Sequence, residues 1–290
     1  MNKFLTLSTS TAVLSSLFII SGCSSSDDGP ATAAVPANAV VINEANAEAT
    51  VASSITSFDT LETAFGAEIA PAMGLKAALA LLDPKIDAAK SALKNSGSDP
   101  VYGVAVSESG ACDFSGSFSF NGDESGTFPS FSDSGTVTLT NCDDGIGFIL
   151  NGSVSWTSSW NVETGSYSDT VKGSLTIEGT GVQTFKFSFT GLDFAETGND
   201  LVFGSETYTI TKASYAIDFT TNGVSGGGFA VKLTAPVVES SGGYNSCPES
   251  GTILITGANG TTAEGTYNGD GTMTIKANGA VVNASANCIY

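Results

Sequence analysis

The sequence contains no histidine and no arginine, and its only basic side chains are ten lysines. Without imidazole there is no Ser-His-Asp or Cys-His catalysis and no histidine-ligated metal. Without guanidinium there is no bidentate clamp for phosphate or carboxylate groups. Twenty-nine acidic residues bring the net charge to −19, so the lysines cannot form the basic patch that nucleic acids require. We therefore expect no nucleic-acid partner and no enzyme of these common types.

The first 22 residues have the layout of a secretory signal, with Lys3 followed by an apolar stretch from Phe4 to Ile20. That stretch is too short and too polar for a comfortable membrane span. It ends in Ile20-Ser21-Gly22-Cys23, a run that resembles the bacterial lipobox. The resemblance implies that Cys23 carries the lipid as the first residue of the mature protein. Ser24, where aspartate is the usual cue for retention in the inner membrane, implies the outer membrane, in a periplasmic or surface-facing position. An ordinary secretory signal followed by a chance cysteine is the alternative.

Four further cysteines remain after Cys23, an even number that fits an oxidising compartment. Three pairings are possible. We favour Cys112 with Cys142 and Cys247 with Cys288, because each of these pairs brackets one local block of strands. No CxxC spacing occurs, so a zinc site or a thioredoxin-type redox motif is not indicated.

The mature chain divides into three parts. Residues 23–39 are small, polar and proline-containing, which predicts a lipidated tether. Residues 40–98 predict a helical segment, and residues 99–290 an antiparallel β domain that forms one folding unit with it. Within the helical segment Asp59 and Glu62 resemble a capping box, although the helix can begin earlier. Apolar residues recur there at steps of three and four, which predicts one apolar stripe that packs on the sheet: Ile55, Phe58, Leu61, Phe65 and Ile69.

From about residue 101 the apolar residues recur at every second position, as in Phe114, Phe118 and Phe120, with serine or threonine between them. Asn-Gly and Asp-Gly pairs punctuate this region and favour tight hairpins. The fold class that follows is mainly β: a large curved antiparallel meander, or open barrel, of about a dozen strands, with the small helical segment packed on it. A transmembrane barrel with its apolar face toward lipid is the alternative.

Two groups of side chains are candidates for a site. Trp156 and Trp160 share one strand face, with Tyr167 nearby in sequence, and form a possible recognition surface, although core packing is the more frequent use of such residues. The other group consists of aspartates that are expected in turns and are weak calcium candidates: Asp123, Asp143, Asp144 and Asp270. None of these aspartates fits the Asp-x-Asp-x-Asp-Gly…Glu calcium loop, and turn aspartates on a solvated negative surface are the more frequent explanation of such residues.

The sequence therefore favours a non-enzymatic lipoprotein that is held at the outer membrane by its lipid and has a β-rich binding or structural domain. Its partner would be an envelope protein, a glycan or an apolar ligand, and we expect no catalytic residues and no cofactor. Two alternatives stay open. One is an enzyme that uses carboxylates, alone or with calcium, such as a glycan hydrolase. The other is a membrane-associated component of secretion or assembly.

Overall fold

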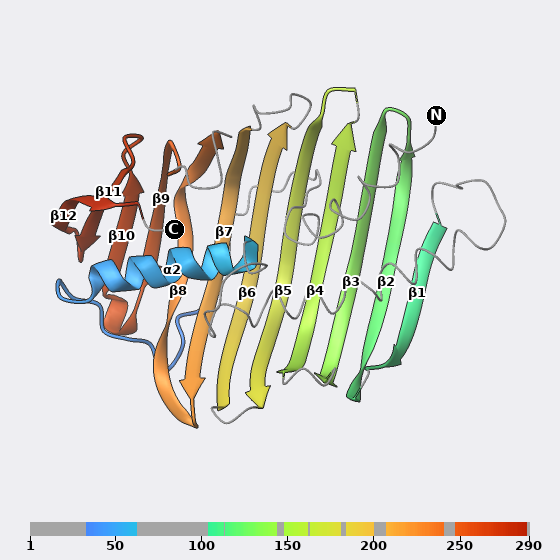
Figure 1. Cartoon of the computed structure of the whole chain (residues 1–290), viewed down its shortest axis with the longest axis horizontal. Helices are drawn as coiled ribbons and strands as arrows, with labels where there is room; N and C mark the ends of the chain where they lie inside the picture. Colours follow the sequence, from blue (N-terminus) through green and yellow to red (C-terminus); the bar gives the residue numbers. More distant parts are fainter. Residues whose placement is uncertain are drawn as a thin grey trace.

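The computed structural model describes residues 33–62, 104–112, 114–143, 148–161, 163–180, 184–199, 207–240 and 247–288. Within these ranges the chain forms one sheet of 12 strands that follow one another in sequence order. Every neighbouring pair is antiparallel. Figure 1 shows the strands side by side from β1 at one edge to β12 at the other. The expected antiparallel meander of about a dozen strands is therefore confirmed, and among the described residues the two edges do not pair.

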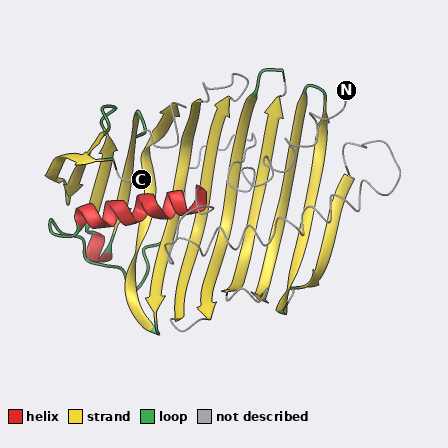
Figure 2. Ribbon diagram, viewed as in Figure 1, coloured by secondary structure: helices red, strands yellow, loops and turns green. Residues whose placement is uncertain are grey.

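The strands differ in length along the sheet. The long ones are β2 (Ser115–Thr127), β3 (Ser130–Asp143), β4 (Phe148–Asn161), β5 (Ser166–Thr180), β6 (Thr184–Asn199), β7 (Thr207–Thr221) and β8 (Val224–Ser240). The short ones are β1 (Val104–Ala111), β9 (Ser250–Thr256), β10 (Thr262–Tyr267), β11 (Thr272–Ala277) and β12 (Ala280–Asn287), and a single 3₁₀ turn, η1 (Ala258–Gly260), joins β9 to β10. Figure 2 shows that strands dominate the described chain.

The alternating sequence gives the sheet two different faces. Apolar residues on one parity, such as Leu150, Ile177 and Ile217, are buried, whereas the positions between them carry serine and threonine. We call the face with the buried apolar residues the inner face and the face with the serine and threonine residues the outer face. The strand register keeps the same parity aligned from strand to strand, so one continuous apolar core lies on the inner face.

The hairpin turns follow the sequence in part. Asn222-Gly223 and Asn278-Gly279 both have positive φ at both residues, as the tight turns between β7 and β8 and between β11 and β12 require. Asn121-Gly122 and Asn151-Gly152 do not form turns, because they lie inside β2 and β4. There the glycine serves a close approach: a Cβ on Gly122 would lie 2.7 Å from the ring of Phe120.

The helix α2 (Ala47–Glu62) lies on the inner face and packs on β9, β10 and β11. Figure 1 shows it running across the strands rather than along them. Val51 and Ile55 are buried in the core, and the Tyr215 hydroxyl donates a hydrogen bond of 3.3 Å to the Ser54 carbonyl. Of the expected apolar stripe, only the side chain of Ile55 is described, and it is buried. The side chains of Phe58 and Leu61, and residues Phe65 and Ile69 altogether, lie outside the described residues.

The start of the helix differs from the capping box that the sequence suggested. Asp59 lies in the last turn of α2, so it cannot cap its beginning. Two asparagines take that place instead: the Asn43 side chain accepts from the Ala45 amide, and the Asn46 side chain accepts from the Asn43 amide. No helix among the described residues combines the length and the hydropathy needed to cross a membrane.

Two disulfides link neighbouring parts of the sheet, in the pairing that the sequence favoured. Cys112 is bonded to Cys142, and Cys247 to Cys288, with Cα–Cα distances of 5.4 and 5.7 Å. The first joins the end of β1 to β3, and the second joins the segment before β9 to the end of β12. The first disulfide therefore lies at the β1 edge of the sheet and the second at the β12 edge.

Candidate functional site

The three aromatic residues singled out in the sequence lie together on the inner face. Trp160 on β4 is the register partner of Tyr167 on β5, and Trp156 lies on the same parity of β4, opposite Val171. All three are partly exposed. Trp156 stacks on Phe120 with ring centroids 5.6 Å apart, and Trp160 stacks on Phe131 at 5.8 Å. The structure therefore brings these residues into one aromatic surface that spans β2 to β5.

Glycines on the adjoining strands let these rings lie close to the backbone. A Cβ on Gly135 of β3 would lie 2.5 Å from the ring of Trp156, and a Cβ on Gly198 of β6 would lie 2.3 Å from Tyr167. Any other residue at these two positions would push the rings away from the sheet. The aromatic surface is thus specified by its neighbours as well as by its own residues.

Carboxylates run between the aromatic side chains. Ser158, Asp169 and Glu196 are consecutive register partners on β4, β5 and β6. Ser158 and Asp169 lie two residues from Trp160 and Tyr167, toward the middle of each strand. Their exposed fractions are only 5%, 5% and 4%. The same row continues in register to Asp133 on β3 and Glu124 on β2.

Hydrogen bonds tie the buried carboxylates to the neighbouring side chains. The Ser158 hydroxyl donates to Asp169 Oδ1 at 2.8 Å, and the Tyr167 hydroxyl donates to Glu196 Oε1 at 2.9 Å. Directly opposed residues in an antiparallel pair have Cβ atoms about 4.5–5.5 Å apart, so Asp169 and Glu196 present two adjacent carboxyl groups on one face. A hydroxyl network fixes their orientation, as a binding or catalytic site requires.

We call this set of residues the acid–aromatic band: Phe131, Trp156, Ser158, Trp160, Tyr167, Asp169 and Glu196. Sequence analysis found its aromatic members but missed the carboxylates. The signal was present, because Asp169 and Glu196 occupy the parity of Val171 and Phe194, where an apolar residue is expected. A charged residue on the apolar parity of a strand is therefore a usable marker.

The aspartates considered for calcium do not come together. The expectation that they lie in turns is wrong for Asp123, which lies inside β2, and for Asp143, which ends β3. Asp270 does lie in a turn, between β10 and β11, and Asp144 is outside the described residues. Hydrogen bonds from the Thr272 side chain and backbone hold the pKa of Asp270 below its ordinary value. Within the described ranges, no three potential ligand side chains converge in a way that could hold a metal ion.

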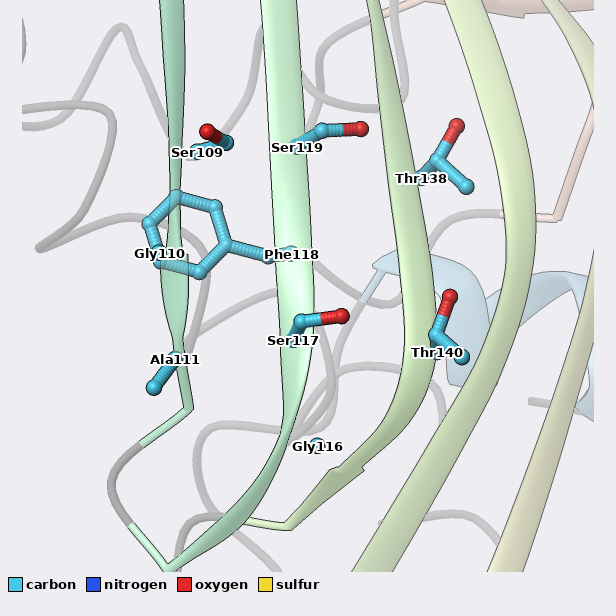
Figure 3. Close-up of a pocket in the computed structure, with 9 residues that line it drawn as sticks. All are labelled: Ser109, Gly110, Ala111, Gly116, Ser117, Phe118, Ser119, Thr138 and Thr140. Carbon is cyan, nitrogen blue, oxygen red and sulfur yellow. The ribbon is translucent and has the colours of Figure 1, made fainter.

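A shallow depression of about 430 Å³ lies between β1, β2 and β3. Figure 3 shows the hydroxyl side chains of Ser117, Ser119, Thr138 and Thr140 along it, with the ring of Phe118 extending across Gly110. None of the residues that line it is charged. The depression offers hydrogen-bonding groups, but none of its lining side chains is a base that could activate these hydroxyls as nucleophiles.

The chain matches no protein-family model, no curated protein and no solved structure, so its function has to be argued from the acid–aromatic band and the sequence.

Proposed function

We propose that the protein is a non-enzymatic lipoprotein of the bacterial outer membrane that binds a glycan at its acid–aromatic band. The anchoring half of the proposal is supported by the lipobox-like run Ile20 to Cys23. The binding half is carried by one observation, the row of buried carboxylates on β5 and β6 beside partly exposed, stacked aromatic rings.

Labelling with an alkyne analogue of palmitate tests the anchor. Wild-type protein should incorporate the label and fractionate with the outer membrane. Cys23→Ser should lose both the label and the membrane retention and accumulate as uncleaved precursor, because the acceptor thiol is gone. Ser24→Ala is the matched control and should behave as wild type. A Cys23→Ser protein that still matures and fractionates with the outer membrane would overturn the lipobox interpretation.

The chemistry of the band fits a neutral sugar. Aromatic faces pack against the C–H faces of sugar rings, whereas carboxylates and hydroxyls exchange hydrogen bonds with sugar hydroxyls. A neutral sugar also needs no arginine or histidine, which the chain lacks. The aromatic rings supply area and the Ser158–Asp169 and Tyr167–Glu196 pairs supply orientation.

Tryptophan fluorescence gives a direct assay, because the only two tryptophans of the chain, Trp156 and Trp160, both lie in the band. The probe is a panel of glucose and N-acetylglucosamine oligosaccharides. At least one should shift the emission, and Trp160→Ala should weaken its binding about two- to tenfold, as an aromatic contact of about 0.5–1.5 kcal/mol implies. The control is Phe114→Ala, which removes a 78% exposed aromatic outside the band. Equal loss of affinity in both variants would contradict the proposal.

Glycan hydrolysis is the second candidate, and the adjacency of Asp169 and Glu196 favours it. Retaining glycosidases place their two carboxyl groups about 5–5.5 Å apart, a separation within reach of opposed residues in a sheet. In that reaction one carboxylate attacks the anomeric carbon while the other group, as a carboxylic acid, gives its proton to the leaving oxygen and the glycosidic bond breaks. Water then hydrolyses the glycosyl ester, with the second carboxylate taking the proton of the water. Release of reducing ends by wild-type protein, abolished in both Asp169→Asn and Glu196→Gln, would establish it. Binding without any release would leave the glycan-binding role alone.

A further inference from the structure

The described chain begins at Ala33, in the middle of the outer face. The Ala33 amide donates a 3.1 Å hydrogen bond to the buried hydroxyl of Ser214, and Ala33 packs with Ala216 and Ala230. Ser214 is a register partner of Asp193 and Lys232, which fixes it on the outer face. The chain therefore meets the sheet on the face opposite to α2.

The next residues hold the chain on that face before it turns the margin of the sheet. The Asn38 side chain donates to Asp218 Oδ1 at 2.5 Å, and the Val40 amide donates to the Gly228 carbonyl at 2.9 Å. At the β9–β10 connection the Ala258 amide donates to the Val40 carbonyl, and the Ile42 amide donates to Thr261 Oγ1. Only after this crossing does the chain enter α2 on the inner face.

The distance from Cys23 to Ala33 limits how the domain can lie on a membrane. Ten residues of fully extended chain span at most about 33–36 Å. Ser214 is the central residue of the 15-residue strand β7. A chain leaving it must cover about 23 Å to reach either end of that strand. The lateral margins lie about as far, because several strands about 4.8 Å apart separate β7 from each edge. Almost the whole tether would be consumed before the inner face could be turned toward the lipid.

The charges of the two faces agree with this geometry. Every lysine in the described strands occupies an outer-face register position: Lys172, Lys186, Lys212, Lys232 and Lys276. Three of them form ion pairs there, with Glu178, Asp193 and Glu264. The inner face instead carries the buried carboxylates of the acid–aromatic band. In a chain with a net charge of −19, the outer face is the one that least repels an anionic lipid surface.

We propose that the outer face docks on the headgroup surface of the membrane that holds the Cys23 lipid, and that the acid–aromatic band consequently faces away from the bilayer. This inference rests on the proposed lipid anchor. Serine and threonine hydroxyls on the outer face, such as those of Ser153 and Ser174, meet the headgroups, and the lysines meet their phosphates. The sheet lies against the membrane, and the partly exposed aromatic rings of the acid–aromatic band, on the opposite face, are presented to soluble glycan.

Depth-dependent quenching tests the orientation. The full-length lipidated protein is reconstituted in phosphatidylcholine–phosphatidylglycerol vesicles, with or without a nitroxide on the choline headgroup. A small fluorophore is placed on Ser153→Cys or Ser174→Cys, both exposed on the outer face, or on the matched Ser53→Cys, exposed on α2 over the inner face. Peptide mapping first verifies that each variant retains both native disulfides. The two outer labels should lose most of their emission, whereas the label on Ser53→Cys should lose little.

Flotation separates the two hypotheses. If the protein fails to float with the vesicles, the lipid anchor is wrong and the orientation falls with it. If it floats and all three labels are quenched equally, or the label on Ser53→Cys most strongly, the anchor stands and the proposed orientation is overturned. Shielding of the outer labels in detergent-solubilised protein away from vesicles, together with a dimeric mass, would assign the outer face to a second copy instead.

Discussion

The two ends of the sheet follow the same alternating pattern but carry different inner faces. Over β9, β10 and β11 the inward residues are purely apolar, as in Ile255, Met273 and Ile275, and α2 covers them. Over β4, β5 and β6 the inward residues include Asp169 and Glu196. The same alternation of inward and outward residues therefore gives a helix-covered core at one end and a polar, hydrogen-bonded band at the other.

The difference between the two ends indicates which of them carries the functional site. Burying a carboxylate costs free energy unless hydrogen bonds compensate it, so selection for stability alone would favour apolar residues at these positions. At the α2 end the inward positions are apolar, as selection for stability alone would favour. Val51 packs so closely there that a Cβ added to Gly265 would lie 2.9 Å from its side chain. Departures from this apolar pattern in the acid–aromatic band are the mark of a site.

The largest expected effect tests whether the two ends fold as one unit. Val51→Asp places an unpaired carboxylate in the contact between α2 and β10, and such burial belongs to the changes that cost more than about 4 kcal/mol. Both tryptophans lie in β4, far from α2 along the sheet, so their fluorescence reports on the long strands during urea unfolding. The midpoint should fall steeply. Ser53→Asp, on the exposed side of α2, should leave it unchanged.

A tryptophan transition that does not respond to Val51→Asp would contradict this expectation. It would mean that the helix-covered end unfolds separately and that the long strands are stable without it.

The disulfides give the next largest effect and compare the two margins directly. Their bonded residues are separated by 30 and 41 positions, for which the chain-entropy model gives about 4 kcal/mol each. Replacing Cys247 and Cys288 by alanine should lower the tryptophan midpoint about as much as replacing Cys112 and Cys142. Reduction of the wild-type protein should reproduce the combined loss. A response to the Cys112–Cys142 replacement alone would again separate the two ends.

The sequence predicted one end of this comparison better than the other. Alternation of apolar and hydroxyl residues was enough for the meander, and the Asn-Gly rule held where both residues could adopt positive φ, as at Asn278-Gly279. The rule failed at Asn121-Gly122 because tertiary packing of Phe120 over glycine won over the local turn preference. A turn motif and a strand glycine are identical in sequence, and only the neighbouring strand distinguishes them.

The site was half predictable for a similar reason. Trp156 and Trp160 share a parity within one strand, so their common face follows from the sequence alone. Their proximity to Glu196 depends on the register of β5 against β6, which carries a bulge between Gly173 and Leu175. Register across several strands is set by bulges and turns that one sequence does not display, so the carboxylate pair could not be assembled from it.

A smaller effect is expected from the band itself. Asp169→Asn keeps the shape of the side chain and its capacity to accept from Ser158, so the free energy of unfolding should change by less than about 1 kcal/mol, the range of cross-strand pairs. The affinity for the glycan should fall by a larger factor than a free-energy change of about 1 kcal/mol represents. Ser158→Ala is the companion variant that removes the hydroxyl donor alone. A loss of several kcal/mol in Asp169→Asn would show that the carboxylate is structural.

The smallest effect concerns Asp270, a carboxylate at the α2 end that belongs to a turn and not to a face. The Thr272 hydroxyl and amide donate to Asp270 Oδ1 at 2.6 and 3.0 Å, which lowers its pKa below the ordinary 3.8. A lowered pKa stabilises the folded chain at pH values above 3.8, and this contribution is lost as the pH falls through the folded value. NMR titration of the side-chain carboxyl carbon should show the lowered pKa, and Thr272→Ala should return it toward 3.8. Thr274→Ala removes a hydroxyl that donates to Asn268, so this variant should leave the pKa of Asp270 unchanged. Since Asp270 is fully exposed, neither variant should move the urea midpoint measurably near neutral pH, in contrast to changes in the covered core only a few residues away. An equal shift of the pKa in both threonine variants would mean that the general negative field of the chain governs this carboxylate, and not the hydrogen bonds of its turn.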